Sequence, residues 1–195
     1  MTAAEKTDDG RIMLDLPLKG ERKYLHSTNI LADLISRFSL RGPVKLEFRQ
    51  MIYDPIYLVP GAPDAPNKAG KFSFHNGDIW QHYGIYTDES RVITKHVDDI
   101  EAKIISGSVR DGDRFSGIIG QPGNFIETVV ALNKALVVSH AGPQRKAIFS
   151  GINVNAIPDK GGVGVELIKK MGTKIYVSDV LWNKAKIGSL TFMTV

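Results

Sequence analysis

Residues 113–140 read DRFSGIIGQPGNFIETVVALNKALVVSH, and this stretch decides the fold. A glycine-rich approach ends at Pro122 and Gly123, and a long, almost wholly apolar run with helical character follows. A helix that is apolar on all sides has to be buried, typically in the middle of a domain. One carboxylate, that of Glu127, falls in its first turns. The sequence therefore predicts a buried helix with a single acidic group near its N-terminus.

The composition is that of an ordinary globular protein of 195 residues, with 43% hydrophobic and 24% charged residues. The chain has no Cys, which excludes disulfides, a thiolate nucleophile and a Cys-ligated metal. Its longest apolar run is shorter than the roughly 18 residues that a membrane span needs. The polar N-terminus lacks the apolar core of a signal peptide. We therefore expect a cytoplasmic protein that does not associate with a membrane.

The net charge of +4 suits either a dispersed, solvated surface or attraction to a polyanion. Basic residues are scattered in pairs such as Arg145 and Lys146, and no nucleic-acid-binding motif surrounds them. We therefore expect no nucleic-acid partner.

Strand patterns outnumber helix patterns along the chain. Helical spacing of apolar residues appears at 30–38 and in the long apolar run. The other regular segments have strand patterns: 11–16, 44–58, 71–87, 91–96, 101–109, 147–157, 163–170, 173–181 and 184–194. The glycine-rich stretch 161–164 precedes one of these strands and is expected to be a loop. Few helices and many strands predict an α+β fold with an antiparallel sheet.

Two connections in the first half carry turn chemistry. Residues 60–70 contain three prolines, so we expect an extended, mobile loop that could act as a lid. Asn76 and Gly77 suit a two-residue type I′ turn, which would place His75 opposite Asp78. His82 would then lie roughly 13 Å from Asp78 by strand rise. One ion cannot bridge that span, so we expect no metal site here.

The order of elements repeats along the chain. Strand, helix and several strands in 11–98 are followed by the same order in 99–195, after a polar tail at 1–10. A repeat at half-chain spacing favours two copies of one structural unit. We therefore expect two halves, of which the second contains the long apolar helix.

The second half resembles the hotdog fold of 3-hydroxyacyl-carrier-protein dehydratases and acyl thioesterases, in which an antiparallel sheet wraps a long, buried central helix. The resemblance rests on these residues: Phe115, Gly117, Pro122, Gly123, Ile126, Glu127, the apolar helix to Val138, and the stretch FSGINV at 149–154. It implies a double hotdog in one chain, with a degenerate first copy, as a fused form of the dimer that such folds usually make. A homodimer of the whole chain stays an alternative.

The resemblance implies activity on an acyl thioester of coenzyme A or of a carrier protein, by hydrolysis or by a dehydratase-like elimination, without a cofactor. The dehydratases have a histidine in a Gly-His-Phe-Pro stretch before Pro-Gly, whereas residues 115–121 contain none, and Glu127 lies one residue nearer to Gly123 than in their pattern. Dehydration needs both a base and an acid. Thioesterases therefore match the chain better, and a non-catalytic protein with an apolar ligand pocket beside the helix is the alternative.

Two residues are candidates for catalysis. Glu127 would activate water, while the N–H groups of Gly123 and Asn124 would stabilise the thioester oxygen. A carboxylate in a first turn also caps its own helix, which is the competing interpretation. His26 precedes the first helix, where it would either supply the missing acid or base or serve as a cap or surface residue. The candidate substrate-binding residues are Gly120, Gln121, Gly123 and Asn124.

Overall fold

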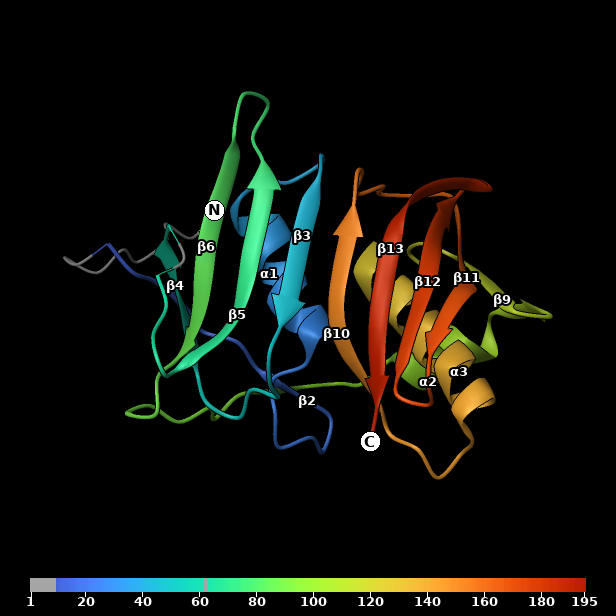
Figure 1. Ribbon diagram of the computed structural model, residues 1–195, viewed down its shortest axis with the longest axis horizontal. Helices are drawn as coiled ribbons and strands as arrows, with labels where there is room; N and C mark the ends of the chain where they lie inside the picture. Colours follow the sequence, from blue (N-terminus) through green and yellow to red (C-terminus); the bar gives the residue numbers. More distant parts are fainter. Residues whose placement is uncertain (1–9, 62) are drawn as a thin grey trace. The chain divides into compact units, whose positions relative to one another are not determined.

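The computed structural model describes residues 10–61 and 63–195 (Figure 1). The chain divides into two compact units, Met1–Asp99 and Ile100–Val195, which are described one at a time. Apart from Gly10, the tail expected at 1–10 lies outside the described residues. No helix among the described residues has the length and hydrophobicity that crossing a bilayer requires.

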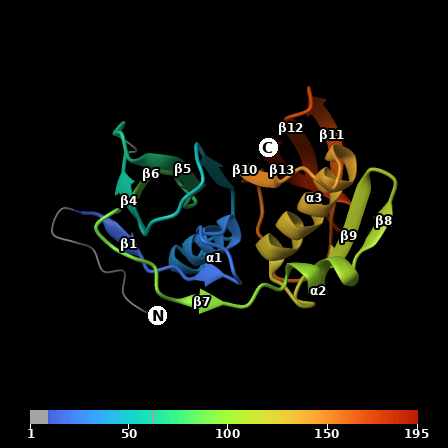
Figure 2. The ribbon, with the colours of Figure 1, turned by 90° about the horizontal axis from the view of Figure 1, so that it is seen from below.

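The second unit is a long helix packed on an antiparallel sheet. Its elements are α2 (Glu101–Ser106), β8 (Val109–Asp111), β9 (Arg114–Ile118), α3 (Phe125–Ala141), β10 (Ala147–Val154), β11 (Gly162–Met171), β12 (Ile175–Trp182) and β13 (Ala185–Thr194). Neighbouring strands pair in the order β8-β9-β11-β12-β13-β10, and every pair is antiparallel. Figure 2 shows α3 against one face of these strands. The long apolar helix and the last four strands expected from the sequence are therefore present.

The core of the second unit lies between α3 and the sheet. Leu132 and Leu136 of α3 are fully buried, as are Val165 and Leu190 of the strands. Along most of β12 the buried positions alternate with half-buried ones, whereas burial is nearly continuous from Phe125 to Asn133 of α3. This contrast follows from the period of two on a strand and from a helix that is apolar on most of its faces.

The first unit repeats this plan with shorter elements. They are β1 (Ile12–Leu14), β2 (Leu18–Lys19), α1 (Ser27–Arg37), β3 (Val44–Phe48), β4 (Ile56–Pro60), β5 (Lys68–His75), β6 (Trp80–Thr87) and β7 (His96–Val97). The antiparallel sheet has the order β1-β4-β6-β5-β3, and β2 and β7 form a separate parallel pair. Phe38, at the end of α1, packs its ring 4.8 Å from Phe74 and 5.4 Å from Tyr83. Aromatic rings thus join α1 to this sheet.

The connection between β4 and β5 crosses the sheet. Both strands are antiparallel to β6, which lies between them, so the chain has to return across β6 before β5 can begin. Tyr86 of β6 donates a hydrogen bond to the carbonyl of Pro63 in this connection. The Nδ2 atom of Asn67 donates to Tyr57 Oη at 3.1 Å and to the Thr87 carbonyl at 2.8 Å. The loop that was expected to be mobile is therefore held by hydrogen bonds to the strands that it crosses.

The predicted loop also extends too far. Lys68, Ala69 and Gly70 belong to β5, and all three are buried. The Lys68 ammonium lies 3.0 Å from the Asp64 carboxylate, and this hydrogen bond and charge hold the pKa of Asp64 below its usual value. The prolines indicated a loop up to residue 70, but pairing with β3 and β6 makes residues 68–70 the start of a strand.

Two predictions of extended structure in the first unit are wrong. Residues 44–58, expected as one strand with an irregularity at Asp54 and Pro55, form two strands, β3 and β4, which are separated by the irregular residues 49–55 and pair with different partners. Residues 91–96 are mostly irregular and contribute only His96 to the short strand β7.

The prediction of a strand at 101–109 is also wrong, because most of it is helix α2. Glu101, Ala102 and Lys103 favour helix over strand, and a helical turn brings Ile100 and Ile104 onto one face. Ile104 is the buried residue of this helix. The two apolar residues suggested a strand only because their spacing is ambiguous in so short a segment.

The β5–β6 hairpin turns over more residues than predicted. His75 pairs with Trp80, not with Asp78. The side-chain oxygen of Asn76 accepts hydrogen bonds from the N–H groups of Asp78 and Ile79, at 3.3 and 3.2 Å, so Asn76 folds the loop as an Asx turn. Among the described residues, no group of three His, Asp or Glu side chains is placed to hold a metal ion.

Candidate functional site

The turn that leads into α3 is held by glycines. Gly120 has a left-handed φ of +86°, and its N–H donates to the Gly123 carbonyl at 2.6 Å. A Cβ atom on Gly123 would lie 2.7 Å from Ile104 Cδ1 and 3.1 Å from Glu127 Cβ. Gly123 therefore allows α2 to pack against the start of α3. The sequence did not predict that Ile104 packs against this turn, because the segment of α2 was expected to be a strand.

A capping box closes the N-terminus of α3. Asn124 is the N-cap residue, and its Oδ1 atom accepts a hydrogen bond from the Glu127 N–H at 3.0 Å. In return, Glu127 Oε2 accepts one from the Asn124 N–H at 3.2 Å. The Asn124 N–H, expected to be available to a substrate oxygen, is thus occupied in this structure. The helix-capping interpretation of Glu127 describes the geometry, and its role in activating water stays a prediction.

The capping box leaves other donors at this helix end. The first four N–H groups of a helix have no carbonyl partner within it. Asn124 satisfies the N–H of Glu127, and the N–H of Thr128 donates to the Asn124 carbonyl at 2.9 Å. The N–H groups of Phe125 and Ile126 are the first-turn donors that neither contact uses. They lie at the helix N-terminus, where the positive end of the helix dipole stabilises negative charge.

His26 lies at the N-terminus of α1, in the first unit. It is the N-cap residue of α1, but its side chain makes no capping hydrogen bond. Its Nδ1 atom lies 2.7 Å from Thr28 Oγ1, which also accepts a 3.4 Å hydrogen bond from the buried ammonium of Lys19. The Thr28 hydroxyl therefore links His26 to Lys19.

The candidate residues predicted from the sequence therefore fall into two groups. Glu127, Asn124, Gly123 and Gly120 are brought together by the turn into α3, and Gln121 belongs to the same turn. His26 belongs to the other unit, at the start of its own helix.

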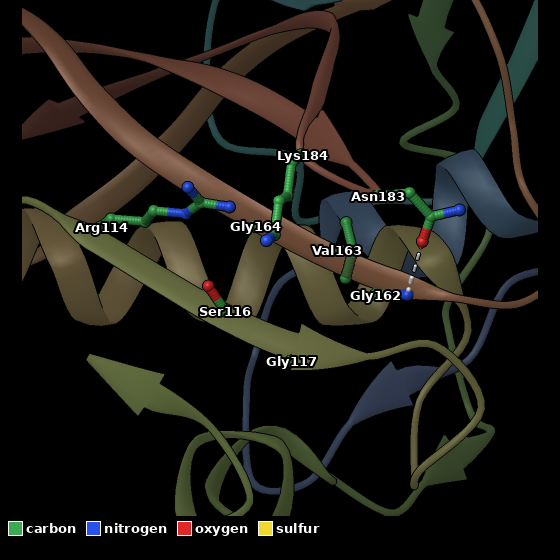
Figure 3. Close-up of a pocket in the computed structure, with 8 residues that line it drawn as sticks. All are labelled: Arg114, Ser116, Gly117, Gly162, Val163, Gly164, Asn183 and Lys184. Atoms are coloured by element: carbon green, nitrogen blue, oxygen red, sulfur yellow. Dashed lines mark hydrogen bonds between the residues drawn. The ribbon is translucent and has the colours of Figure 1, made fainter. Parts of the chain in front are cut away.

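A cleft of about 390 Å³ opens on the second unit beside β9, β11 and the β12–β13 turn (Figure 3). Arg114, Ser116 and Lys184 contribute polar side chains to it. Gly117 of β9 faces α3, since a Cβ there would lie 3.5 Å from Thr128 Cγ2. Arg114 and Ser116 alternate with Gly117 along the strand, so their side chains point away from α3.

Sequence reasoning missed this cleft. Its residues come from three separate segments and match no motif, and the stretch 161–164 was expected to be a loop. Gly162 and Gly164 instead belong to β11. The only sequence signal was the unusual concentration of glycine before a strand.

Solved structures of similar fold match almost the full length of the chain. The tesB protein of Mycobacterium avium subspecies paratuberculosis is 9% identical, with a TM-score of 0.50, over 97% of this chain and 94% of that chain. The erythromycin dehydratase is 10% identical, with a TM-score of 0.48, over 95% and 90%. The 12:0-ACP thioesterase of Umbellularia californica is 7% identical, with a TM-score of 0.45, over 95% and 96%. No protein-family model matches the sequence, and no curated protein is similar to it in sequence.

The match to the mycobacterial protein, together with the antiparallel sheet and the few helices, shows that the chain has the hotdog fold. The resemblance noted in the sequence is thereby confirmed at the level of the fold. At such low identity the reaction has to be argued from the residues of the site.

Proposed function

We propose that this hotdog-fold protein hydrolyses an acyl thioester of coenzyme A or of a carrier protein, and that Glu127 orients or deprotonates the attacking water. One observation carries the proposal: the Glu127 carboxylate is held at the N-terminus of α3, beside first-turn N–H groups that the capping box does not use. A base and an oxyanion-stabilising helix end are the two elements that thioester hydrolysis needs.

In the proposed reaction, the thioester carbonyl oxygen lies at the N-terminus of α3. The N–H groups of Phe125 and Ile126 donate to that oxygen and stabilise the negative charge that develops on it. Glu127 takes a proton from water as the oxygen of that water adds to the carbonyl carbon. The carbon–sulfur bond then breaks, the thiolate takes up a proton, and the products are a carboxylic acid and a free thiol. Gly120, Gln121, Gly123 and Asn124 form the turn along which the substrate approaches.

We also propose that the two units are two hotdog copies, with a boundary near residue 98. What supports this is the shared strand arrangement, in which each long helix precedes four strands of the sheet. A dehydratase-like elimination would need a second acid or base, and His26 is the candidate for that role. A homodimer of the chain is not needed for either reaction.

A non-catalytic ligand-binding protein is the second candidate function. The capping box favours it, because Glu127 and Asn124 already satisfy each other and need no substrate to explain them. In this alternative, the apolar surroundings of α3 frame a pocket and Glu127 stabilises only the helix.

The experiment that separates the two follows thiol release from a panel of acyl-CoA esters and acyl-carrier proteins. Glu127→Gln keeps the size of the side chain and an oxygen that can accept from the Asn124 N–H, but it removes the base. We expect the rate to fall by about 10²–10⁴-fold, with little change in thermal stability. Glu47→Gln, on an exposed residue of β3, is the matched control.

If Glu127→Gln retains the wild-type rate, Glu127 is a cap and not the base. If the wild-type protein binds acyl thioesters but cleaves none of them, the ligand-binding function replaces the enzymatic one. His26→Gln is assayed in parallel for elimination of water from 3-hydroxyacyl thioesters, where it should matter only if the protein is a dehydratase.

A further inference from the structure

The cleft on the second unit contains two cations and a hydroxyl group that the proposed reaction does not use. We propose that it binds a phosphate group. The residues that carry the proposal are Arg114 and Ser116 of β9 and Lys184 of the β12–β13 turn, which Figure 3 shows around Gly164.

Arg114 has an unsatisfied donor in this cleft. Its Nε atom is buried and has no hydrogen-bond partner among the described residues. A buried donor without a partner costs about 1–3 kcal/mol, so such a group in a folded protein calls for a ligand, an ion or a water molecule. The guanidinium offers several donors in a plane, a geometry that matches two oxygens of a phosphate.

Glycine makes room for this guanidinium. A Cβ on Gly164 would lie 3.4 Å from Arg114 Nε, 3.5 Å from Ser116 Oγ and 3.2 Å from the Phe115 carbonyl oxygen. Arg114 and Ser116 therefore lie close over the bare backbone of β11, and their donors converge there. A methyl group at position 164 would be in van der Waals contact with both side chains and tight against the Phe115 carbonyl.

Lys184 is placed by a strained turn. Asn183 and Lys184 both have left-handed φ angles, of +47° and +72°. Lysine rarely adopts this conformation, so it persists only where the surrounding contacts impose it. Asn183 supplies two of these contacts, since its N–H donates to the Gly162 carbonyl at 2.9 Å and its Oδ1 accepts from the Gly162 N–H at 3.2 Å. The turn is thus tied to β11, with Lys184 at the edge of the cleft.

The charge of the cleft is positive and is not neutralised from within the described residues. No acidic residue lines it, and neither Arg114 nor Lys184 has an ion pair in the described part of the chain. The nearest acidic neighbours by register are Glu166 of β11 and Asp111 of β8, which are both opposite Arg114 and both exposed, and Asp113, which lies 2.9 Å from His140 Nε2. An anion with several acceptor oxygens fits this arrangement better than a carboxylate, which would leave part of the donors unused.

Two phosphate sources are compatible with the proposed function, on which this step of the inference rests. Coenzyme A carries a 3′-phosphate monoester and a diphosphate, whereas a carrier protein presents one phosphodiester at the start of its pantetheine arm. Both would use the same donors. Because the cleft holds two cations and is open to solvent, either group can reach it.

The test measures binding by isothermal titration calorimetry without any thioester. The probes are inorganic phosphate, coenzyme A, 3′-dephospho-coenzyme A and 4′-phosphopantetheine. The variants are Arg114→Gln, Arg114→Lys and Lys184→Gln, with Lys169→Gln on exposed β11 as a control that removes the same charge outside the cleft. Circular dichroism melting confirms that each variant is folded, and Arg114→Lys keeps the charge should the glutamine variant not fold.

We expect Arg114→Gln to weaken phosphate binding by about 10- to 100-fold, since a hydrogen bond to a charged group contributes about 1.5–3 kcal/mol. Lys184→Gln should cost a smaller factor of about five, and Arg114→Lys should fall between wild type and Arg114→Gln. Coenzyme A binding more tightly than its dephospho form would identify the 3′-phosphate as the group bound. Equal affinity for coenzyme A and 4′-phosphopantetheine would identify the arm phosphate.

Saturable binding of none of the probes, or equal losses in Lys169→Gln and Arg114→Gln, would overturn the proposal. Because these measurements involve no cleavage, a protein that binds phosphate but hydrolyses no thioester would retain the phosphate site and lose the proposed reaction.

Discussion

The two units arrange their strands alike but thread the chain through them differently. In the second unit the order from β9 is β9-β11-β12-β13-β10, and in the first it is β1-β4-β6-β5-β3. In both units the strand before the long helix (β9 or β1) pairs with the second strand after that helix (β11 or β4). The first strand after the helix (β10 or β3) lies at the opposite end of the order. The central pair is exchanged: β12 precedes β13 in the second unit, whereas β6 follows β5 in the first. Because all neighbouring strands are antiparallel in both units, strands at corresponding places in the two orders run in the same direction relative to their neighbours.

The difference shows that antiparallel pairing, rather than chain order, sets the arrangement. In the second unit, short turns join β11 to β12 and β12 to β13. In the first, the connection from β4 to β5 has to return across β6, a kind of connection that usually needs a dozen or more residues. A short return suffices because Pro60 is opposite Tyr83 and Lys68 is opposite Tyr86, so the chain moves back by only about 10 Å.

The largest expected effect compares the two helices. Leu132 of α3 and Leu34 of α1 are both fully buried. Leu132→Ala and Leu34→Ala should each lower the free energy of unfolding by about 2–5 kcal/mol, through lost transfer energy and the cavity left behind. Calorimetry also shows whether the two changes lower one transition or two. A loss under about 1 kcal/mol for either would mean that its helix can collapse onto the sheet.

A pair of glycines tests whether corresponding strands are equally crowded. Gly188 of β13 is opposite Val154, and Gly70 of β5 is opposite Phe48, each against the last residue of the first strand after the helix. An added Cβ would lie 2.2 Å from the Asn153 carbonyl oxygen at Gly188, and 2.4 Å from that of Glu47 at Gly70. Gly188→Ala and Gly70→Ala should each cost about 1–3 kcal/mol in chemical denaturation. Unequal costs would show that the exchanged central pair relaxes differently.

Helix capping distinguishes the two helix starts. Asn124→Ala removes the side-chain acceptor for the Glu127 N–H and should lower stability by about 1 kcal/mol. His26→Ala removes no capping bond from α1 and should affect helix stability less. Thermal melting of the two variants measures the difference. The reverse ranking would show that the contacts of His26 with Thr28 outweigh a cap.

The smallest expected effect concerns pH and the connection 61–67. The pKa of Asp64 is lowered by its hydrogen bond with Lys68. A depressed pKa stabilises the folded state above the unfolded value of about 3.9, and this contribution is lost as pH falls through the lower folded value. The melting temperature of wild type should therefore exceed that of Asp64→Asn near neutral pH, and the two should converge as the pH falls below the lowered pKa of Asp64. A constant difference across this range would show that the carboxylate charge is not involved.

The sequence by itself determined the elements whose pattern is long and local. The apolar helix Phe125–Ala141 and the four strands after it follow from uninterrupted periodicity, and Glu127 was placed in the first turns of that helix. Short or ambiguous segments were interpreted wrongly, as at α2 and at the β5–β6 turn, where one buried isoleucine or one asparagine hydrogen bond decides the outcome.

Only the tertiary structure decided the strand order, the crossing connection and the cleft. The sheet order depends on hydrogen bonds between segments far apart in the chain, which no local pattern encodes. Arg114 and Lys184 are ordinary charged residues in the sequence, and they meet only because β9 pairs with β11 and the β12–β13 turn is tied to Gly162. Local side-chain preferences select helix or strand, whereas the pairing of distant backbone groups determines which side chains converge.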